Sequence, residues 1–120
     1  MPVLARTQLR RATIPIVDRN RITHRIVQNH DKTKAEAHAI FDSTILFLQM
    51  CTAFPNERFS PSPDVDIGWH VFLLYTRAYA AFCNALVGHF LHHEPNDRPG
   101  MKRRDGLRHT IRFMKTHGIK

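Results

Sequence analysis

Inward-facing residues recur every three or four positions along the middle of the chain, which is the spacing of one face of an α-helix. The segment Thr33 to Glu36 reads T-K-A-E, a capping box that satisfies free backbone amides at a helix start. After it, the repeating positions are Ala37, Ile40, Phe41, Thr44, Leu48 and Cys51. The pattern predicts a helix from this cap to about Ala53.

A second repeating stripe predicts one long central helix. Ser62 is a suitable N-cap, Pro63 suits the first turn, and acidic residues follow where the helix dipole is positive. No proline interrupts the chain from there to Val87, and Gly88 is a natural C-terminal stop. The inward positions are Val65, Trp69, Phe72, Thr76, Tyr79, Phe82 or Cys83, and Leu86.

Two shorter helices complete the predicted fold. Asp18 is a candidate N-cap for a helix to about Asn29, and a last helix is expected from about Asp105 to Gly118. The inward positions of the last helix are Leu107, Ile111 and Met114. With no convincing strand, the fold class is all-α: a small bundle of about four helices with one long central helix. We expect residues 1–17 to be a basic, flexible leader and residues 18–120 to be a single helical domain.

Composition agrees with one folded domain. The chain has 120 residues, 42% of them hydrophobic, which suffices for a single core. No apolar run approaches the ~20 residues that cross a bilayer, and the N-terminus lacks a signal-peptide pattern. We therefore expect a cytoplasmic protein without a membrane partner.

Charge is divided unevenly along the chain. Residues 1–25 carry six Arg against one Asp, residues 98–120 carry eight basic residues against one Asp, and the segment between them is acidic. Such basic ends could contact nucleic acid or another polyanion, although basic tails are often simply solvated. The candidates for nucleic-acid contact, as the alternative function, are Arg10, Arg11, Arg19, Arg21, Lys102, Arg103, Arg104, Arg108 and Arg112.

Asp, His and Cys residues are concentrated between residues 66 and 93. Asp66 and His70 are spaced i, i+4, which places both on one helix face. They could bind a metal together, or Asp66 could cap the helix and orient a structural His70. Cys83, His92 and His93 offer the thiolate and imidazole ligands that suit Zn²⁺. These histidines could equally meet carbonyls at a helix end, and the motif could define only the fold of an interaction protein.

The first hypothesis is therefore a small helical protein that binds Zn or Fe; a role as an enzyme or as an accessory to one is left open. Its candidate metal ligands are Asp66, His70, Cys83, His92 and His93, while His89 is the weakest candidate. Neither a catalytic residue nor a substrate is indicated by the sequence.

The long helix restricts how these ligands could meet. If it is continuous to Val87, His70 lies about 25 Å from its end. The six residues from Val87 to His93 span at most about 20 Å. Either the helix breaks near Gly88 or earlier, or a homodimer brings His92 or His93 of a second copy beside His70.

The two cysteines are not expected to form a disulfide. A hairpin between the two long helices would place Cys51 near Asp66 and Cys83 at the far end, nearer His38. Bridged Cα atoms must lie within about 7 Å. Each thiol would then lie in a separate histidine neighbourhood.

The motifs S-P-S-P-x-V-D-x-x-W-H and G-x-F-L-H-H-x-P, between Ser60 and Pro95, resemble the glycine-rich domain-containing protein-like family. The resemblance extends over residues 24–30, 39–55 and 110–119. It implies a shared V-D-x-x-W-H element but no specific activity. The chain lacks the glycine-rich tail and RNA-binding-like segments of the plant relatives, so the resemblance does not bring their RNA role with it.

Overall fold

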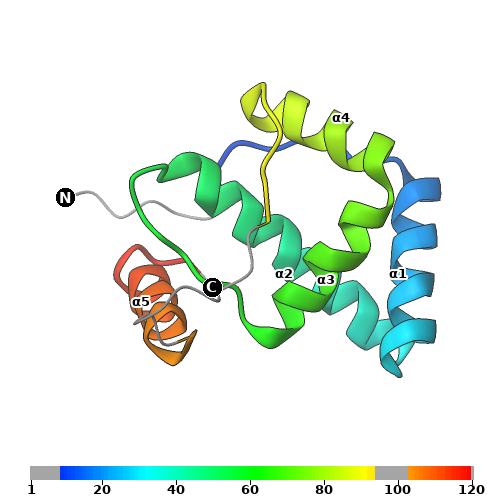
Figure 1. The fold of residues 1–120 in the computed structure, drawn as a ribbon, viewed down its shortest axis with the longest axis horizontal. Helices are drawn as coiled ribbons and strands as arrows, with labels where there is room; N and C mark the ends of the chain where they lie inside the picture. The colour runs from blue at the N-terminus through cyan, green and yellow to red at the C-terminus, as the bar shows by residue number, and fades with distance from the viewer. Residues whose placement is uncertain (1–8, 94–102, 120) are drawn as a thin grey trace.

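The computed structural model describes residues 9–93 and 103–119, and this part of the chain contains five helices and no strand (Figure 1). They are α1 (Ile16–His30), α2 (Lys34–Ala53), α3 (Pro63–Leu74), α4 (Thr76–Val87) and α5 (Arg103–Thr116). The all-α class is confirmed, with five helices in place of about four. Within the described ranges, no helix has both the length and the apolar character needed to span a bilayer.

The predicted helix starts hold for α2 and α3 but not for α1. Thr33 caps α2 through a complete capping box with Glu36. At the start of α3, the Ser62 hydroxyl accepts a hydrogen bond from the Val65 backbone amide. Helix α1, in contrast, begins after Pro15, and Asp18 lies in its first turn rather than at its cap. An acid in the first turn still favours the helix dipole, which explains why the sequence pattern suggested a nearby start.

The long central helix is the main correction to the sequence prediction. The chain leaves helical geometry at Tyr75, with φ −97° and ψ 69°, so residues 63–87 form two helices. Helix α4 turns across the end of α3 in Figure 1. Thr76, predicted to face inward, is exposed at the first position of α4. Gly88 does end α4 as predicted, in the left-handed conformation at φ 80°.

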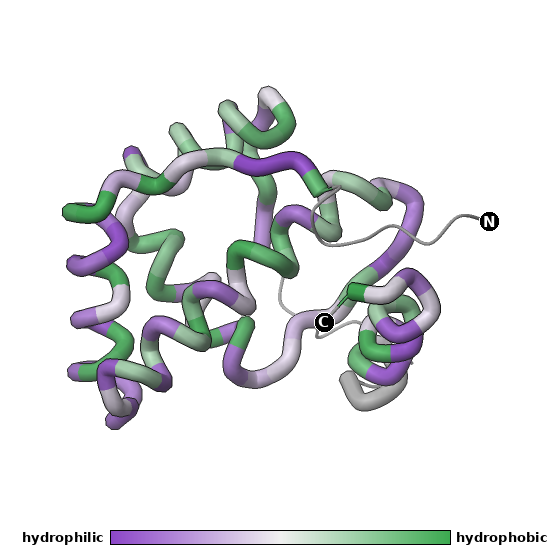
Figure 2. The backbone as a smooth tube through the Cα atoms, turned by 180° about the vertical axis from the view of Figure 1, so that it is seen from behind, coloured by the Kyte–Doolittle hydropathy of each residue, from purple (hydrophilic) through white to green (hydrophobic). Residues whose placement is uncertain are grey.

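The core lies among α1, α2, α3 and α4. Its fully buried side chains include Phe41 and Leu48 on α2 and Phe72 on α3. Hydrophobic and hydrophilic stretches alternate along the helices (Figure 2). Of the predicted leader, residues 1–8 lie outside the described residues. Ala12 and Ile14 pack against this core.

Helix α5 packs on a second, smaller cluster that contains Leu9, Leu46, Met50 and Ile119. The Thr110 hydroxyl oxygen accepts a hydrogen bond from the Ser60 backbone nitrogen at 2.8 Å. The centre of the Phe113 ring lies 4.7 Å from that of the Phe54 ring. Ile111, predicted to face inward, is 45% exposed because the buried side of α5 is centred on Thr110 and Phe113.

Gly68 sets the closest approach between α2 and α3. A Cβ atom added there would lie 2.1 Å from the Thr44 hydroxyl oxygen and 3.0 Å from a methyl carbon of Ile40. Thr44 cannot turn away cheaply, because it is fully buried and its hydroxyl donates to the Ile40 carbonyl. The two helices can therefore pack at this distance only with glycine at position 68.

Gly68→Ala should lower the free energy of unfolding by about 1–3 kcal/mol, the usual cost of overpacking a tight core. Urea denaturation followed by circular dichroism measures it. In the double variant Gly68→Ala, Thr44→Ala, the clash with the hydroxyl is removed, so the loss should be smaller than the sum of the two single losses. Simple additivity would contradict the contact.

Glu36 should add a pH-dependent contribution at the start of α2. The hydrogen bond from the Thr33 backbone amide is the largest cause that lowers the pKa of Glu36 below its ordinary 4.5. A carboxylate with a lowered pKa stabilises the fold above its unfolded pKa, and this stability is lost as pH falls through the folded pKa. The stability advantage over Glu36→Gln should thus shrink on acidification below about pH 4.5. A constant difference across that range, measured by urea titrations, would contradict the linkage.

Candidate metal centre

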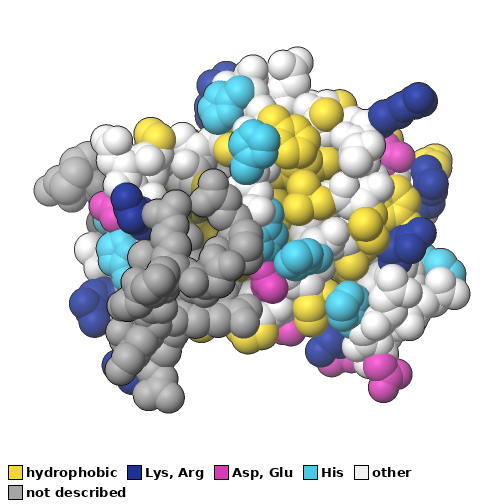
Figure 3. Space-filling view, viewed as in Figure 1, with side chains coloured by type: hydrophobic (Ala, Val, Ile, Leu, Met, Phe, Trp, Pro, Cys, Tyr) yellow, Lys and Arg dark blue, Asp and Glu magenta, His cyan; other side chains and the backbone are white. Residues whose placement is uncertain are grey.

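Three predicted ligands come together on one face of the molecule. One oxygen of Asp66 lies 2.7 Å from Nε2 of His93 and 3.7 Å from Nε2 of His70. One ligand atom from each of the three residues lies within 4.8 Å of the other two. Figure 3 shows histidine and acidic side chains next to one another near the middle of the face seen. Within the described residues, this is a group that could hold a metal ion.

Two of the three residues are positioned by the first two turns of α3. Asp66 and His70 lie one helical turn apart, as their spacing predicts, and are 28% and 63% exposed. The Ser62 cap and Pro63 fix where this helix begins. The register of Asp66 relative to the core then follows from the neighbouring buried Val65 and Trp69.

His93 reaches this group from the segment that follows α4. Its side chain is only 8% exposed, and its ring lies 4.2 Å from the Trp69 ring and 4.6 Å from the His70 ring, measured between centroids. The 2.7 Å contact with Asp66 is a hydrogen bond in which Nε2 carries the proton. A metal ion would take the place of that proton.

The hydroxyl of Tyr79 holds the return segment against α3. It accepts a hydrogen bond from the Trp69 indole at 2.9 Å and donates one to the Leu91 carbonyl. In a straight helix, residues 69 and 79 would lie about 15 Å apart along the axis. The break at Tyr75 brings them into contact, and the chain after Gly88 then runs back toward α3, as Figure 1 shows.

The helix break at Tyr75 explains how His70 and His93 of one chain can lie close together. The alternatives were a bend in the helix or a second copy of the chain, and the structure has the bend, 13 residues before Gly88. The geometric reason for a homodimer is thereby removed. Homodimer formation itself stays a prediction.

The other predicted ligands do not join the group. Cys83 is fully buried in the core, because it lies on the inward face of α4. His92 is exposed, and its ring lies 4.9 Å from that of Phe90. His89 is also exposed, with Nδ1 at 3.3 Å from the Phe90 carbonyl oxygen, as expected for a histidine that meets a carbonyl near a helix end.

Both cysteines are free thiols, as predicted. Both pack with the main core near Tyr79, because α4 folds back over α3. Burial raises the pKa of the Cys51 thiol to about 12. Burial is also the main cause that raises the pKa of Tyr79, and both thiols add to the effect. The Tyr79 hydroxyl therefore keeps the proton that it donates to Leu91.

Comparison with known proteins identifies the family. The family model described as UCP032817-like matches residues 9–118. The chain belongs to the UCP032817-like family. The predicted membership of the glycine-rich domain-containing protein-like family is wrong, because the model that matches nearly the whole chain is a different one. No curated protein and no solved structure matches the chain.

The UCP032817-like match covers the described residues that carry the cluster, from Asp66 to His93. Sequence reasoning identified all three of these residues but missed the two that position His93. Trp69 and Tyr79 were assigned to the core, where they do lie. Their polar atoms were the available signal, because a buried indole N–H and a buried phenol each need a hydrogen-bond partner.

Two of the basic residues of the alternative function already have partners. Arg19 forms a 2.7 Å ion pair with Asp42, and the Arg21 guanidinium lies 5.0 Å from the centre of the Tyr75 ring. Four others are exposed: Arg10, Arg11, Arg108 and Arg112. Lys102 and the side chains of Arg103 and Arg104 lie outside what the structure describes. Nucleic-acid binding stays a prediction.

Tyr79→Phe should lower the free energy of unfolding by about 1–3 kcal/mol, because the Leu91 carbonyl loses its donor and the Trp69 indole loses its acceptor. Tyr75→Phe is the matched control: its hydroxyl accepts from Arg25 and donates to the Arg21 carbonyl, but at an exposed position where water can replace it. Chemical denaturation measures both. Equal losses in the two variants would contradict the special position of Tyr79.

Proposed function

We propose that this protein binds one divalent transition-metal ion, Zn²⁺ or Fe²⁺, through Asp66, His70 and His93. The observation that carries the proposal is that one ligand atom of each residue lies within 4.8 Å of the other two. Asp66 and His93 are 27 residues apart in the sequence. In a tetrahedral zinc site with bonds of about 2.0–2.2 Å, neighbouring ligand atoms lie about 3.3 Å apart. Side-chain shifts of about 1 Å would bring the cluster to that geometry.

The donor set favours an ion with open coordination positions. Structural zinc sites are closed by four protein ligands, whereas catalytic zinc sites have three and keep a position for water or substrate. Two imidazoles and one carboxylate also form the set used by non-haem Fe²⁺ oxygenases. His70, at 63% exposure, places the open side toward solvent, while His93 anchors the ion from within. This supports a catalytic or accessory role over a purely structural one.

Asp66 contributes the negative charge of the site. A carboxylate between two neutral imidazoles lowers the net charge of a bound M²⁺ complex to +1, and it is a hard oxygen ligand suited to Zn²⁺ or Fe²⁺. The packing of His93 against the Trp69 ring, at 4.2 Å between centroids, restricts rotation of the imidazole. A ligand held in place by packing loses less conformational entropy when it binds a metal, which raises the affinity.

Untagged protein should bind about one Zn²⁺ or Fe²⁺ per chain in titration calorimetry after chelator treatment. His93→Ala should weaken binding by more than about 100-fold, since even partners outside the coordination shell contribute 10–100-fold. Acidification should also weaken binding, because protons compete with the metal for the imidazoles.

His92→Ala is the matched control for this titration, because it removes a neighbouring histidine that is exposed and outside the group. It should leave the affinity unchanged. A stoichiometry near zero in the wild type would refute the proposal, and the Asp66–His93 hydrogen bond would then be only a structural link. Equal effects of His92→Ala and His93→Ala would point to unspecific histidine binding.

A further inference from the structure

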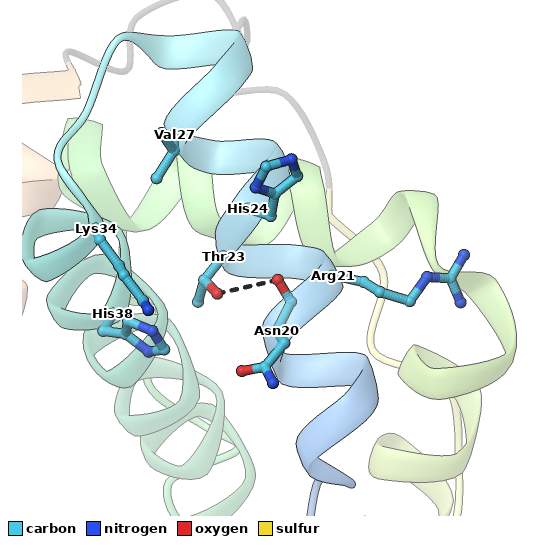
Figure 4. Close-up of a pocket in the computed structure, with 7 residues that line it drawn as sticks. All are labelled: Asn20, Arg21, Thr23, His24, Val27, Lys34 and His38. Atoms are coloured by element: carbon cyan, nitrogen blue, oxygen red, sulfur yellow. Dashed lines mark hydrogen bonds between the residues drawn. The ribbon is translucent and has the colours of Figure 1, made fainter.

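A groove between α1 and α2 is lined mainly by polar and basic side chains. Its volume is about 620 Å³, and Figure 4 shows the side chains that line it from both helices. None of the described residues that line it is acidic, and none belongs to the Asp66, His70 and His93 group. The lining residues are Asn20, Arg21, Thr23, His24, Val27, Lys34 and His38.

A hydrogen bond from Arg19 determines which ring nitrogen of a neutral His38 carries the proton. Nε of Arg19 donates a hydrogen bond to Nδ1 of His38 at 3.2 Å, so Nδ1 must be the acceptor. A neutral imidazole then carries its proton on Nε2, which becomes a donor. Arg19 is itself held by its 2.7 Å ion pair with Asp42, and its guanidinium lies 5.1 Å from the centre of the Phe41 ring. The orientation of His38 is therefore set from outside the groove.

Lys34 is placed where helix electrostatics disfavours it. It is the first residue of α2, where the positive end of the helix dipole repels a cation. It forms no ion pair with any other residue that the structure describes. Figure 4 shows its ammonium group close to the ring of His38, one turn further along α2. These two groups thus lie together in a groove that no acidic residue lines within the described part of the chain.

The facing wall on α1 adds further polar groups. Asn20 and His24 lie one turn apart on α1, while the guanidinium of Arg21, which also lines the groove, lies 5.0 Å from the centre of the Tyr75 ring. The Thr23 hydroxyl is already used, because it donates to the Arg19 and Asn20 carbonyls. Polar side chains therefore line the groove from both walls, Asn20 and His24 from α1 and Lys34 and His38 from α2.

We propose that this groove binds the phosphoryl group of a small organic phosphate. The Lys34 ammonium supplies a point charge of the kind that binds phosphate, and Nε2–H of His38 and the Asn20 amide supply directed donors. Ligand pockets usually measure about 300–1,000 Å³, so 620 Å³ leaves room for an organic group beside the phosphate. Val27 and the methyl group of Thr23 provide an apolar wall for that part.

The test is a titration of the full chain with inorganic phosphate and with AMP at constant ionic strength, followed by amide chemical shifts and calorimetry. Lys34→Gln should weaken AMP binding about tenfold or more, as expected for the loss of one charge-assisted hydrogen bond. His38→Phe should also weaken it, with circular dichroism used to verify folding. Inorganic phosphate should bind at the same residues, but more weakly than AMP.

Lys32→Gln is the matched control. It removes the same charge two positions away, but Lys32 lies 4.0 Å from Asp64 and lines a different cavity. Its effect should be less than twofold. Asp66→Asn should likewise leave AMP binding unchanged, which separates this site from the proposed metal centre.

Three outcomes would overturn the proposal. One is that neither inorganic phosphate nor AMP shifts the groove residues at millimolar concentration. Another is that Lys32→Gln and Lys34→Gln weaken binding equally, which would indicate only a general response to net charge. The third is that an RNA oligonucleotide binds with steep salt dependence while AMP does not, which would make the groove part of a nucleic-acid surface.

Discussion

The arrangement of the second half of the molecule depends on one buried hydroxyl. Tyr79 links the Trp69 indole on α3 to the Leu91 carbonyl beyond α4, so a single oxygen joins three segments. Without this hydroxyl, the Trp69 indole N–H and the Leu91 carbonyl would each lose a hydrogen-bond partner. An unpaired polar group in the core costs about 1–3 kcal/mol. This link ties the segment after Gly88 to α3 two residues before His93, whose own hydrogen bond to the Asp66 carboxylate completes the return.

The sequence predicted the parts of the fold that local chemistry determines. The capping box at Thr33, the Ser62 cap and the stop at Gly88 are confirmed because each depends on residues within one helical turn. The break at Tyr75 could not be predicted in this way. No proline or glycine marks it, and the inward stripe from Trp69 to Tyr79 continues across it with helical spacing. Packing accompanies the break instead: the Tyr75 ring is partly buried against the main core, and the guanidinium of Arg21 on α1 lies 5.0 Å from its centre.

The same distinction applies to the candidate metal site. Asp66 and His70 follow from spacing alone, whereas the choice of His93 over Cys83 and His92 depends on where the chain lies after the break. The proposed phosphate groove had no counterpart in the sequence reasoning, because its two walls come from different helices. Lys34, a cation at the positive end of a helix dipole, was the one local conflict that could have drawn attention to it.

The distance of 27 residues between Asp66 and His93 has a consequence for biosynthesis. During translation, α3 leaves the ribosome with Asp66 and His70, two of the three proposed ligands, already one turn apart, but His93 follows only after all of α4 has been made. Closing that loop carries an entropic cost until the turn at Tyr75 has formed and Trp69 has met Tyr79. A nascent chain should therefore bring Asp66, His70 and His93 together late, so that an ion at the proposed metal centre would bind only to molecules whose tertiary structure is already in place.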